Sequence, residues 1–303
     1  MMYKYGTLWK SVLDSTNHAL QCGALHSIPT EYEFVEQQGV CFLVRILSNL
    51  VRKDEAKQKQ EKETTTSRKE FNPFLPYEED LFVADISDTH VCILNKYNVV
   101  NYHLLVITRQ FEEQETLLTL QDFEAMWACL AEFEGLAFYN SGKIAGASQR
   151  HKHLQIVPLP LVPKGARIPI EPLLADAKFQ GSVGTVPGFP FAHAFMPIDS
   201  QWTPPTKAAQ MTLDCYYTLL RAMGLLGGEA NKNQLSGAYN LLATREWMLI
   251  VPRSQESFES ISVNSLGFAG AMLVRNEQNL QLLKDCGPMT ILRSVAVSKF
   301  PPF

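Results

Sequence analysis

Apolar positions recur along the chain with two periods, one typical of helices and one typical of strands. Residues 119–142 carry apolar side chains every three to four positions, which predicts an amphipathic helix that ends near Gly142. Its apolar positions are Leu120, Phe123, Met126, Leu130, Phe133 and Leu136. Residues 7–24 and 206–227 have similar spacing and predict two further helices.

Shorter apolar runs interrupted by polar turns predict pairs of strands. The pairs are residues 31–46, 90–108 and 235–253. The layout of 235–253 resembles that of 90–109, which suggests an internal duplication. We expect residues 161–207 to be irregular because they are rich in proline. The C-terminal stretch 261–287 is expected to be a loop followed by a helix.

The run HKHLQIV at residues 151–157 predicts a strand, since it becomes apolar toward its end and Pro158 and Pro160 follow. Because side chains alternate along a strand, its three polar residues share one face and the residues between them share the other. The first set is His151, His153 and Gln155, and the second is Lys152, Leu154 and Ile156. Two interpretations remain open: a solvent-facing edge strand with ordinary surface polar residues, or a chemical site.

Composition places the chain among globular proteins. It has 303 residues, of which 46% are hydrophobic and 19% are charged. The net charge of −4 gives no basic surplus for binding duplex nucleic acid, although a few lysines and arginines can still converge in one pocket. The N-terminus lacks an apolar signal core, and no stretch has the length of a membrane span.

The cysteines bear on the cellular compartment of the protein, and one polar segment bears on where the chain is irregular. The six cysteines are scattered without a C-x-x-C pair, so neither a disulfide framework nor a cysteine zinc site is expected. We therefore expect a reduced, cytoplasmic protein. Residues 53–70 are almost wholly polar, which predicts a surface loop or a frayed helix. Lys53, at the inner edge of this segment, is kept as a candidate site residue.

The two histidines of the run could ligate a metal or attack an electrophile. A metal site would need further ligands, which His90, His103 or His193 could supply, but Gln155 is a poor ligand for transition metals. Phosphoryl chemistry needs fixed donors around a phosphate. The preceding segment GASQR offers backbone N–H groups, a hydroxyl and an amide, although an ordinary turn has the same composition.

The run also resembles the His-x-His-x-Gln signature of the nucleotidyltransferase branch of the histidine-triad superfamily. With its upstream segment, NSGKIAGASQRHKHLQ is similar to the ATP adenylyltransferases, also called diadenosine tetraphosphate phosphorylases. LNKYNVVNYHLLVITR, AYNLLATREWMLIVPR and NSLGFAGAMLV resemble other parts of that family, so the likeness covers about residues 40–295. It implies an α+β, histidine-triad-like (GalT-like) fold: a mixed or antiparallel sheet with flanking helices. Two related halves, 1–190 and 191–303, would pack as one unit, the first carrying the motif and the second completing the nucleotide site.

The resemblance implies a two-step mechanism. His153 would attack the α-phosphate of diadenosine tetraphosphate, ATP would leave, and phosphate would then release ADP from the adenylyl-histidine. His151 would orient the nucleophile through its backbone carbonyl, and Gln155 would bond the phosphoryl oxygens. The hydrolase branch has histidine at this third position, and glutamine cannot act as a general base, which favours transfer to phosphate over hydrolysis.

The same resemblance assigns substrate contacts elsewhere in the chain. These are Lys53, Asn95, Lys96, Asn140, Gly146, Ala147, Ser148, Gln149, Asn264, Ser265, Leu266 and Arg275. From the residues alone, Asn264 and Ser265 could instead cap a helix, and His103 is more readily a satisfied core histidine than a ligand. Two positions depart from the family pattern: Lys152, where the superfamily prefers an apolar residue, and Arg275, where we expect lysine in some relatives.

The resemblance further implies which molecules the protein meets. A divalent metal, Mg²⁺, would be held by substrate phosphates rather than by protein ligands, and no organic cofactor is expected. The partners would be diadenosine polyphosphates, ATP, ADP and phosphate, with no nucleic acid or membrane partner. The protein would be a monomer or a small homo-oligomer.

Several alternatives remain at this stage. One is another nucleotidyltransferase of the same fold, such as a hexose-1-phosphate uridylyltransferase, although that family usually has proline where Lys152 stands. Others are a dinucleoside polyphosphate hydrolase, a metal-dependent hydrolase that uses the histidines as ligands, and a dinucleotide-binding regulator without activity.

Overall fold

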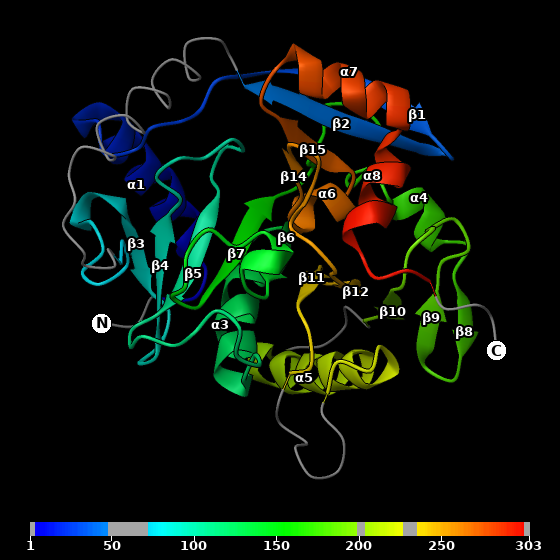
Figure 1. Ribbon diagram of the computed structural model, residues 1–303. Coiled ribbons are helices and arrows are strands. Elements are labelled where there is room, and N and C mark those ends of the chain that lie inside the picture. The colour runs from blue at the N-terminus through cyan, green and yellow to red at the C-terminus, as the bar shows by residue number, and fades with distance from the viewer. Residues whose placement is uncertain (1–3, 48–71, 199–203, 227–234, 300–303) are drawn as a thin grey trace.

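One antiparallel sheet of ten strands runs through the protein, with helices on both of its faces (Figure 1). The computed structural model describes residues 4–47, 72–198, 204–226 and 235–299. The strand order is β3-β4-β5-β7-β6-β11-β12-β10-β9-β8. The strands are β3 Phe82–Asp85, β4 His90–Leu94, β5 Leu104–Thr108, β6 Gly135–Asn140, β7 His153–Pro158, β8 Lys178–Gln180, β9 Val183–Thr185, β10 Ala194–Pro197, β11 Tyr239–Ala243 and β12 Trp247–Pro252.

The strand order repeats within this sheet. The first half of the sheet has the order β3-β4-β5-β7-β6, and the second half has the corresponding order read from its outer edge, β8-β9-β10-β12-β11. Thus β6 corresponds to β11 and β7 to β12. Pro158 of β7 pairs with the first residue of β6, and Pro252 of β12 pairs with the first residue of β11, so the two prolines are equivalent. HLQIVP of β7 then aligns with WMLIVP of β12, and Trp247 takes the place of His153. The pairing of 235–253 with 90–109 was therefore wrong, because 235–253 corresponds to β6 and β7.

Three helices cover one face of the sheet and bury an apolar core against it. They are α1 Leu8–Cys22, α3 Leu120–Leu130 and α5 Pro205–Ala222. A capping box starts α3: the Thr119 hydroxyl accepts from the Asp122 N–H, and the Asp122 carboxylate accepts from the Thr119 N–H. Within the described ranges, no helix is long and apolar enough to cross a membrane.

The helix predicted over 119–142 was too long. The structure ends α3 at Leu130 and starts β6 at Gly135, and every residue of β6 is buried. Both faces of β6 are covered, since Ala137 and Tyr139 belong to the core under the helices and Leu136 and Phe138 to the core on the other face, so its sequence, GLAFYN, does not alternate. A continuous apolar run fits a helix or a strand equally well, and here pairing on both edges selects the strand.

A smaller sheet and four helices cover the opposite face. The sheet order is β1-β2-β15, with β15 parallel to β2. The elements are β1 Thr30–Gln37, β2 Val40–Leu47, β15 Ala271–Val274, α4 Glu171–Leu174, α6 Ser265–Phe268, α7 Glu277–Cys286 and α8 Pro288–Val295. Their apolar side chains pack on the central strands and on the second half of the large sheet. Over the first half, the same face carries a smaller cluster: Phe74, Val91, Ile93, Leu105 and Ile107.

The sequence analysis missed the shortest strands. The stretch 161–207, expected to be irregular, contains β8, β9 and β10, and the stretch 261–287 contains β15 and β14 Ile261–Ser262. β13 Ser257–Phe258 pairs with β14. None of these strands exceeds four residues, so each is too short to show a period and forms because a neighbouring strand supplies its hydrogen bonds.

Strand β7 lies inside the large sheet, between β5 and β6, so the solvent-facing edge strand was the wrong interpretation. The predicted alternation is confirmed: Leu154 and Ile156 belong to the core under the helices. Lys152 points to the same side and is buried, and its Nζ lies 2.7 Å from the Asp122 carboxylate and 3.1 Å from that of Glu112. Asp122 also accepts a 3.0 Å hydrogen bond from His90, so the buried ammonium is paired.

We predict that Asp122→Ala lowers the free energy of unfolding by about 3–5 kcal/mol, because it removes the buried carboxylate that pairs with Lys152 and leaves only the partly exposed Glu112 as its counter-ion. Burial alone would raise the pKa of Asp122, but the His90 hydrogen bond and the Lys152 charge outweigh it and lower the pKa to about 2. The stabilisation is therefore present above pH ~4 and lost as pH falls toward 2. Urea unfolding between pH 2 and pH 7 measures both effects.

The matched control is the double variant Asp122→Ala with Lys152→Met, which removes both charges. It should recover a large part of the lost stability, because an apolar pair replaces the ion pair. Equal losses in the single and double variants would contradict this account.

Candidate active site

A cavity of about 540 Å³ is lined by residues from the first half of the large sheet and from the β1-β2-β15 sheet. The residues chosen from the sequence that line it are Asn95, Lys96, Asn140, Gly146, Ser148, Gln149, His153, Gln155, Asn264, Leu266 and Arg275. Three chosen residues are not among its lining: Ala147, His151 and Ser265. Lys53 lies outside the described residues. Residues far apart in the sequence therefore meet at one site.

The ring of His153 is held in one tautomer. Its Nδ1 donates to the backbone carbonyl of His151 at 2.8 Å, as expected from the sequence, so Nε2 carries the lone pair. Burial lowers the pKa of His153 to about 4, although the hydrogen bond to His151 acts in the opposite direction. The imidazole is therefore neutral at physiological pH and has a nucleophilic nitrogen at the cavity.

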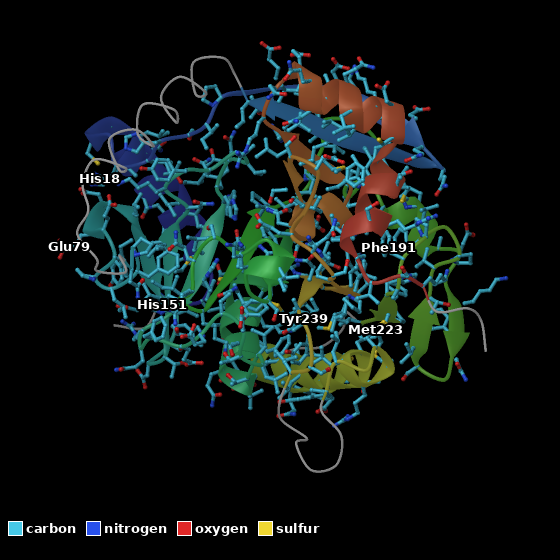
Figure 2. The ribbon with its side chains drawn as sticks, viewed as in Figure 1. His18, Glu79, His151, Phe191, Met223 and Tyr239 are labelled. Carbon is cyan, nitrogen blue, oxygen red and sulfur yellow. The ribbon has the colours of Figure 1, made fainter. Side chains whose placement is uncertain are left out.

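The ring of His151, just before β7, is occupied by other contacts (Figure 2). Its Nε2 donates to the Thr108 carbonyl at 2.8 Å, and its Nδ1 accepts from the Asn72 amide at 3.0 Å. His151 therefore contributes its backbone carbonyl to the site, and its ring fixes the chain that carries this carbonyl.

Gln155 is oriented by a chain of hydrogen bonds that the sequence analysis did not anticipate. The Asn95 amide donates to Nδ1 of His103 at 3.2 Å, so His103 Nε2 carries a proton and donates to the Gln155 Oε1 at 3.0 Å. Burial lowers the pKa of His103 to about 4, which keeps the ring neutral. With its oxygen bound in this way, Gln155 presents its NH₂ group as the donor for a ligand.

Gln114 separates the ends of β6 and β7. The two strands pair as far as Phe138 with Gln155, and the same register continued would pair Tyr139 with Leu154 and then Asn140 with His153. Instead, Gln114 Oε1 accepts from the His153 N–H at 2.8 Å, and its Nε2 donates to the Asn140 carbonyl at 2.9 Å. This buried carboxamide takes the place of backbone hydrogen bonds and fixes the spacing at the cavity. No local sequence signal marks Gln114.

Three hydrogen bonds to its side-chain oxygen orient Asn140. Oδ1 accepts from the Asn240 amide at 2.9 Å, from the Ser265 N–H at 3.0 Å and from the Ser265 hydroxyl at 2.7 Å. Its NH₂ group is therefore the part left for a ligand in the cavity. Ser265 does not line the cavity and orients Asn140 through these two hydrogen bonds; its expected substrate contact stays a prediction. Its neighbour Asn264 caps α6, as the structural alternative proposed, and also lines the cavity.

The segment between β6 and β7 approaches the C-terminal half closely at Gly146. This residue has a φ of +90°, and a Cβ there would lie 2.7 Å from the Val263 carbonyl oxygen and 3.0 Å from the Asn264 Cα. Only glycine fits this approach. The next residues that line the cavity are Ser148 and Gln149, and the C-terminal half adds Leu266 and Arg275. Lys96 also lines it, paired with Glu78 at 2.6 Å.

Two family models together account for most of the chain. Residues 1–176 match the Ap4A phosphorylase N-terminal domain, and residues 187–298 match the ATP adenylyltransferase C-terminal domain. The chain belongs to the Ap4A phosphorylase family. The resemblance inferred from the sequence motifs is thereby confirmed.

Two curated yeast proteins are similar to this member of the Ap4A phosphorylase family. Diadenosine 5',5'''-P1,P4-tetraphosphate phosphorylase 2 of Saccharomyces cerevisiae (strain ATCC 204508 / S288c) is 29% identical over 259 residues, which cover 76% of each chain. Protein APA1 of the same organism is 28% identical over 292 residues, covering 88% of this chain and 86% of that protein.

Solved structures agree in fold with this member of the family. The crystal structure of yeast Ap4A phosphorylase Apa2 matches with a TM-score of 0.78 at 22% identity, covering 100% of this chain and 98% of that chain. The structure of Apa2 in complex with Ap4A has the same TM-score at 23% identity, covering 99% and 100%. The expected α+β fold, an antiparallel sheet with flanking helices, is therefore confirmed and is shared with Apa2.

The family motif does not mark the apolar wall of the cavity, and the sequence analysis missed it. Gln155 pairs with Leu105, and Leu105 pairs with Ile93, so the three side chains stand in a row on one face. Phe74 adds an edge-to-face contact with His153 at a centroid distance of 5.4 Å. This surface suits a flat aromatic ligand beside the nucleophilic nitrogen. Its signal, apolar residues at alternate positions of two strands, also fits an ordinary core.

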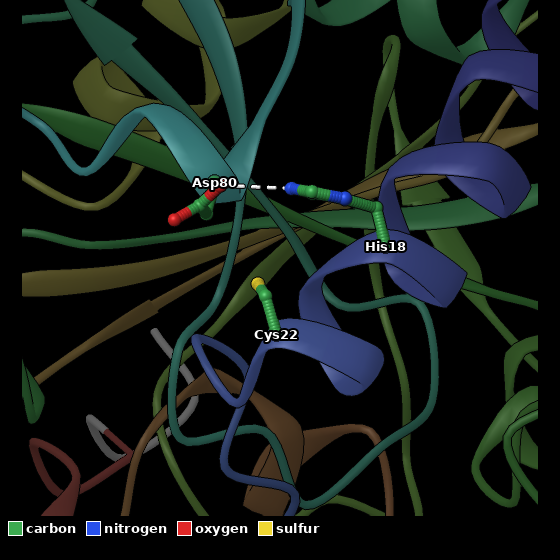
Figure 3. A group of neighbouring side chains, drawn as sticks. All are labelled: His18, Cys22 and Asp80. Carbon is green, nitrogen blue, oxygen red and sulfur yellow. Dashed lines mark hydrogen bonds and ion pairs between the residues drawn. The ribbon is translucent and has the colours of Figure 1, made fainter.

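Within the described residues, side chains that could hold a metal ion gather away from the family motif. They are His18, Cys22 and Asp80, all exposed, with His18 Nε2 at 2.8 Å from the Asp80 carboxylate (Figure 3). None of the three lines the cavity. Glu78 is the carboxylate that lines the cavity among the described residues, and it is paired with Lys96. These observations give no support to the alternative of a metal-dependent hydrolase.

We predict that Gly146→Ala lowers kcat/KM on the order of 100-fold, because the added methyl group displaces the segment at Val263 and Asn264 from the cavity. Gly181→Ala is the matched control: its φ is +62°, but a Cβ there meets nothing within 4 Å. The control should show only the backbone strain, of about 1 kcal/mol, in thermal unfolding. Equal activity in both variants would mean that the close approach at Gly146 has no role.

Proposed function

We propose that this chain catalyses the reversible phosphorolysis of diadenosine tetraphosphate, in which Ap4A and phosphate give ADP and ATP through an adenylyl group on His153. The observation that carries the proposal is the hydrogen bond from His153 Nδ1 to the His151 carbonyl, which leaves Nε2 with its lone pair at the cavity. Sequence similarity to Diadenosine 5',5'''-P1,P4-tetraphosphate phosphorylase 2 supports the choice of substrate.

In the first step, Nε2 of His153 forms a bond to the α-phosphorus of Ap4A, and the bond from this phosphorus to the bridging oxygen breaks. ATP leaves with the electron pair of that bond. The Nδ1 proton remains shared with the His151 carbonyl, which stabilises the positive charge on the ring. In the second step, a phosphate oxygen bonds to the phosphorus, the P–N bond breaks, and ADP leaves.

The donors around His153 suit the charge that develops on the phosphoryl oxygens. The NH₂ groups of Gln155 and Asn140 are available because the oxygens of both amides are already bound. They are held in place before substrate arrives, so they need no reorganisation in the transition state. Ser148 and Gln149 add a hydroxyl and an amide from the preceding segment.

Glutamine at position 155 favours phosphate over water as the acceptor. Water must lose a proton to become a good nucleophile, and a carboxamide cannot accept one at neutral pH. Phosphate is already an anion and needs no general base. The apolar row of Leu105 and Ile93, together with Phe74, suits the adenine base of the transferred adenylyl group.

We further propose that Mg²⁺, when bound, would be held by the substrate and would supply positive charge to its phosphates. The residues of the cavity fit a metal held by the substrate, because its one described carboxylate, Glu78, pairs with Lys96. We also propose a cytoplasmic enzyme that acts as a monomer or a small homo-oligomer. A hexose-1-phosphate uridylyltransferase or a dinucleoside polyphosphate hydrolase remains the alternative activity.

Intact-mass measurement tests the proposal. Wild-type protein mixed with Ap4A without phosphate should gain the mass of one AMP unit, and added phosphate should discharge it as ADP. His153→Ala should gain no mass, because it lacks the nucleophile. Release of AMP and ATP into water would instead indicate a hydrolase, and an adduct formed only from a UDP-sugar would indicate a uridylyltransferase.

The pH dependence of the first step gives an independent check. The reactive form of His153 is the neutral ring, and burial lowers its pKa to about 4. The single-turnover rate of adenylyl transfer should therefore be level between about pH 6 and 8 and fall as pH drops toward 4. A midpoint near 6.5 would contradict a buried, neutral nucleophile, because that is the ordinary pKa of histidine.

A further inference from the structure

Arg45 is a half-buried cation whose charge has no ion-pair partner among the described residues. It stands on β2 and lines the cavity. Its Nε is buried without a hydrogen-bond partner, and its Nη1 makes a long, 3.3 Å hydrogen bond to the Thr30 hydroxyl. Burial lowers the pKa of Arg45, and its interaction with Tyr32 acts in the opposite direction. Such a charge is costly unless a ligand supplies the counter-ion.

Other cations in or beneath the site already have partners. Lys96 pairs with Glu78 at 2.6 Å, and Lys152 pairs with Asp122 at 2.7 Å. Arg253 is buried, but its Nη1 donates to the Asn240 side chain at 2.6 Å and to the Val263 carbonyl at 2.8 Å. The fold therefore satisfies these charges internally and leaves Arg45 to the cavity.

Arg45 stands close in register to a second cation of the cavity. It is the partner of Leu273 across the parallel β2–β15 pair, and Arg275 follows two residues later. All three residues line the cavity. One wall, formed by the small sheet, thus carries two guanidinium groups, whereas His153 and Gln155 belong to the wall formed by the large sheet.

The direction of nucleophilic attack gives the two walls of the cavity different parts of the substrate. In-line displacement places the leaving group on the side of the phosphorus opposite to the nucleophile. Because His153 attacks from the large sheet, the leaving phosphates extend away from it, toward the small sheet that covers this face. A guanidinium group there would bind phosphate oxygens through charge-assisted hydrogen bonds.

We propose that Arg45, together with Arg275, forms an anion subsite for the phosphates of the leaving nucleotide. This inference rests on the proposed phosphorolysis, since it assigns one end of the same substrate. In the forward reaction the subsite holds the triphosphate of the departing ATP, and in the reverse reaction it positions the ATP that attacks adenylyl-His153. The bound polyphosphate then supplies the counter-ion that Arg45 lacks.

Two reactions of the same intermediate separate this subsite from the α-phosphate site. Exchange of labelled phosphate into ADP forms and discharges adenylyl-His153 without a leaving nucleoside triphosphate, whereas Ap4A phosphorolysis needs one. For Arg45→Gln, the ratio of the phosphorolysis kcat/KM to the exchange kcat/KM should fall on the order of tenfold or more. Arg45→Lys should recover part of this ratio, because it keeps the charge but not the planar donors.

Arg293→Gln is the matched control, because Arg293 is exposed on α8 and does not line the cavity. Its ratio should equal that of the wild type. An equal loss of both reactions in Arg45→Gln would overturn the assignment to the leaving nucleotide, and so would an unchanged ratio. If wild-type protein shows neither exchange nor phosphorolysis, the proposed function fails instead, and the two failures are thus distinguishable.

Stability gives a second readout that a structural role for Arg45 would not produce. Arg45→Met removes a half-buried charge that has no ion-pair partner and whose buried Nε has no hydrogen bond, so the melting temperature of the ligand-free protein should rise. The further rise on adding a non-hydrolysable Ap4A analogue should be smaller than in the wild type, because the variant binds the analogue more weakly. A lower melting temperature without ligand would mean that Arg45 stabilises the fold and would overturn the proposal.

Discussion

The hydrogen bond from His153 Nδ1 to the His151 carbonyl determines what the rest of the site can do. It requires the chain at residues 151–153 to be extended and rigid, and because side chains alternate there, Lys152 must then point into the core. The buried ammonium group of Lys152 needs a counter-ion there, and Asp122 of α3 supplies it. On the edge of the strand, Gln114 fixes the backbone of His153 itself. A nucleophile on one face thus depends on an ion pair on the other.

Burial keeps the histidines of the site neutral, so its positive charge comes from other residues. The pKa values of His103 and His153 are both lowered to about 4 by desolvation, so these rings are neutral at physiological pH. Positive charge at the cavity comes instead from guanidinium groups, such as those of Arg45 and Arg275. A neutral nucleophile beside permanent cations suits an anionic substrate, because the cations bind its phosphates while the ring keeps its lone pair.

The repeated strand order allows equivalent positions in the two halves of the large sheet to be compared, and only the first half carries the motif residues. In the second half, Trp247 and Leu249 occupy the positions of His153 and Gln155. The face on which they lie is covered by the small sheet and α8, and both residues belong to the core there. Polar side chains at these positions would be buried without partners. The C-terminal half contributes to the cavity in another way, through Asn264, Leu266 and Arg275.

The sequence by itself determined the local chemistry: the strand predicted over 151–157, which the structure places at His153–Pro158, its two faces, the glycine at 146, and the family to which these motifs belong. These features depend on residues close together in the chain, where alternation and backbone freedom act directly. Only the tertiary structure decided that 135–140 is a strand, that His103 orients Gln155, that Gln114 spaces the strands, and that Arg45 reaches the cavity. Each depends on a partner distant in sequence, and apolar runs or single polar residues carry no local signal of that partner.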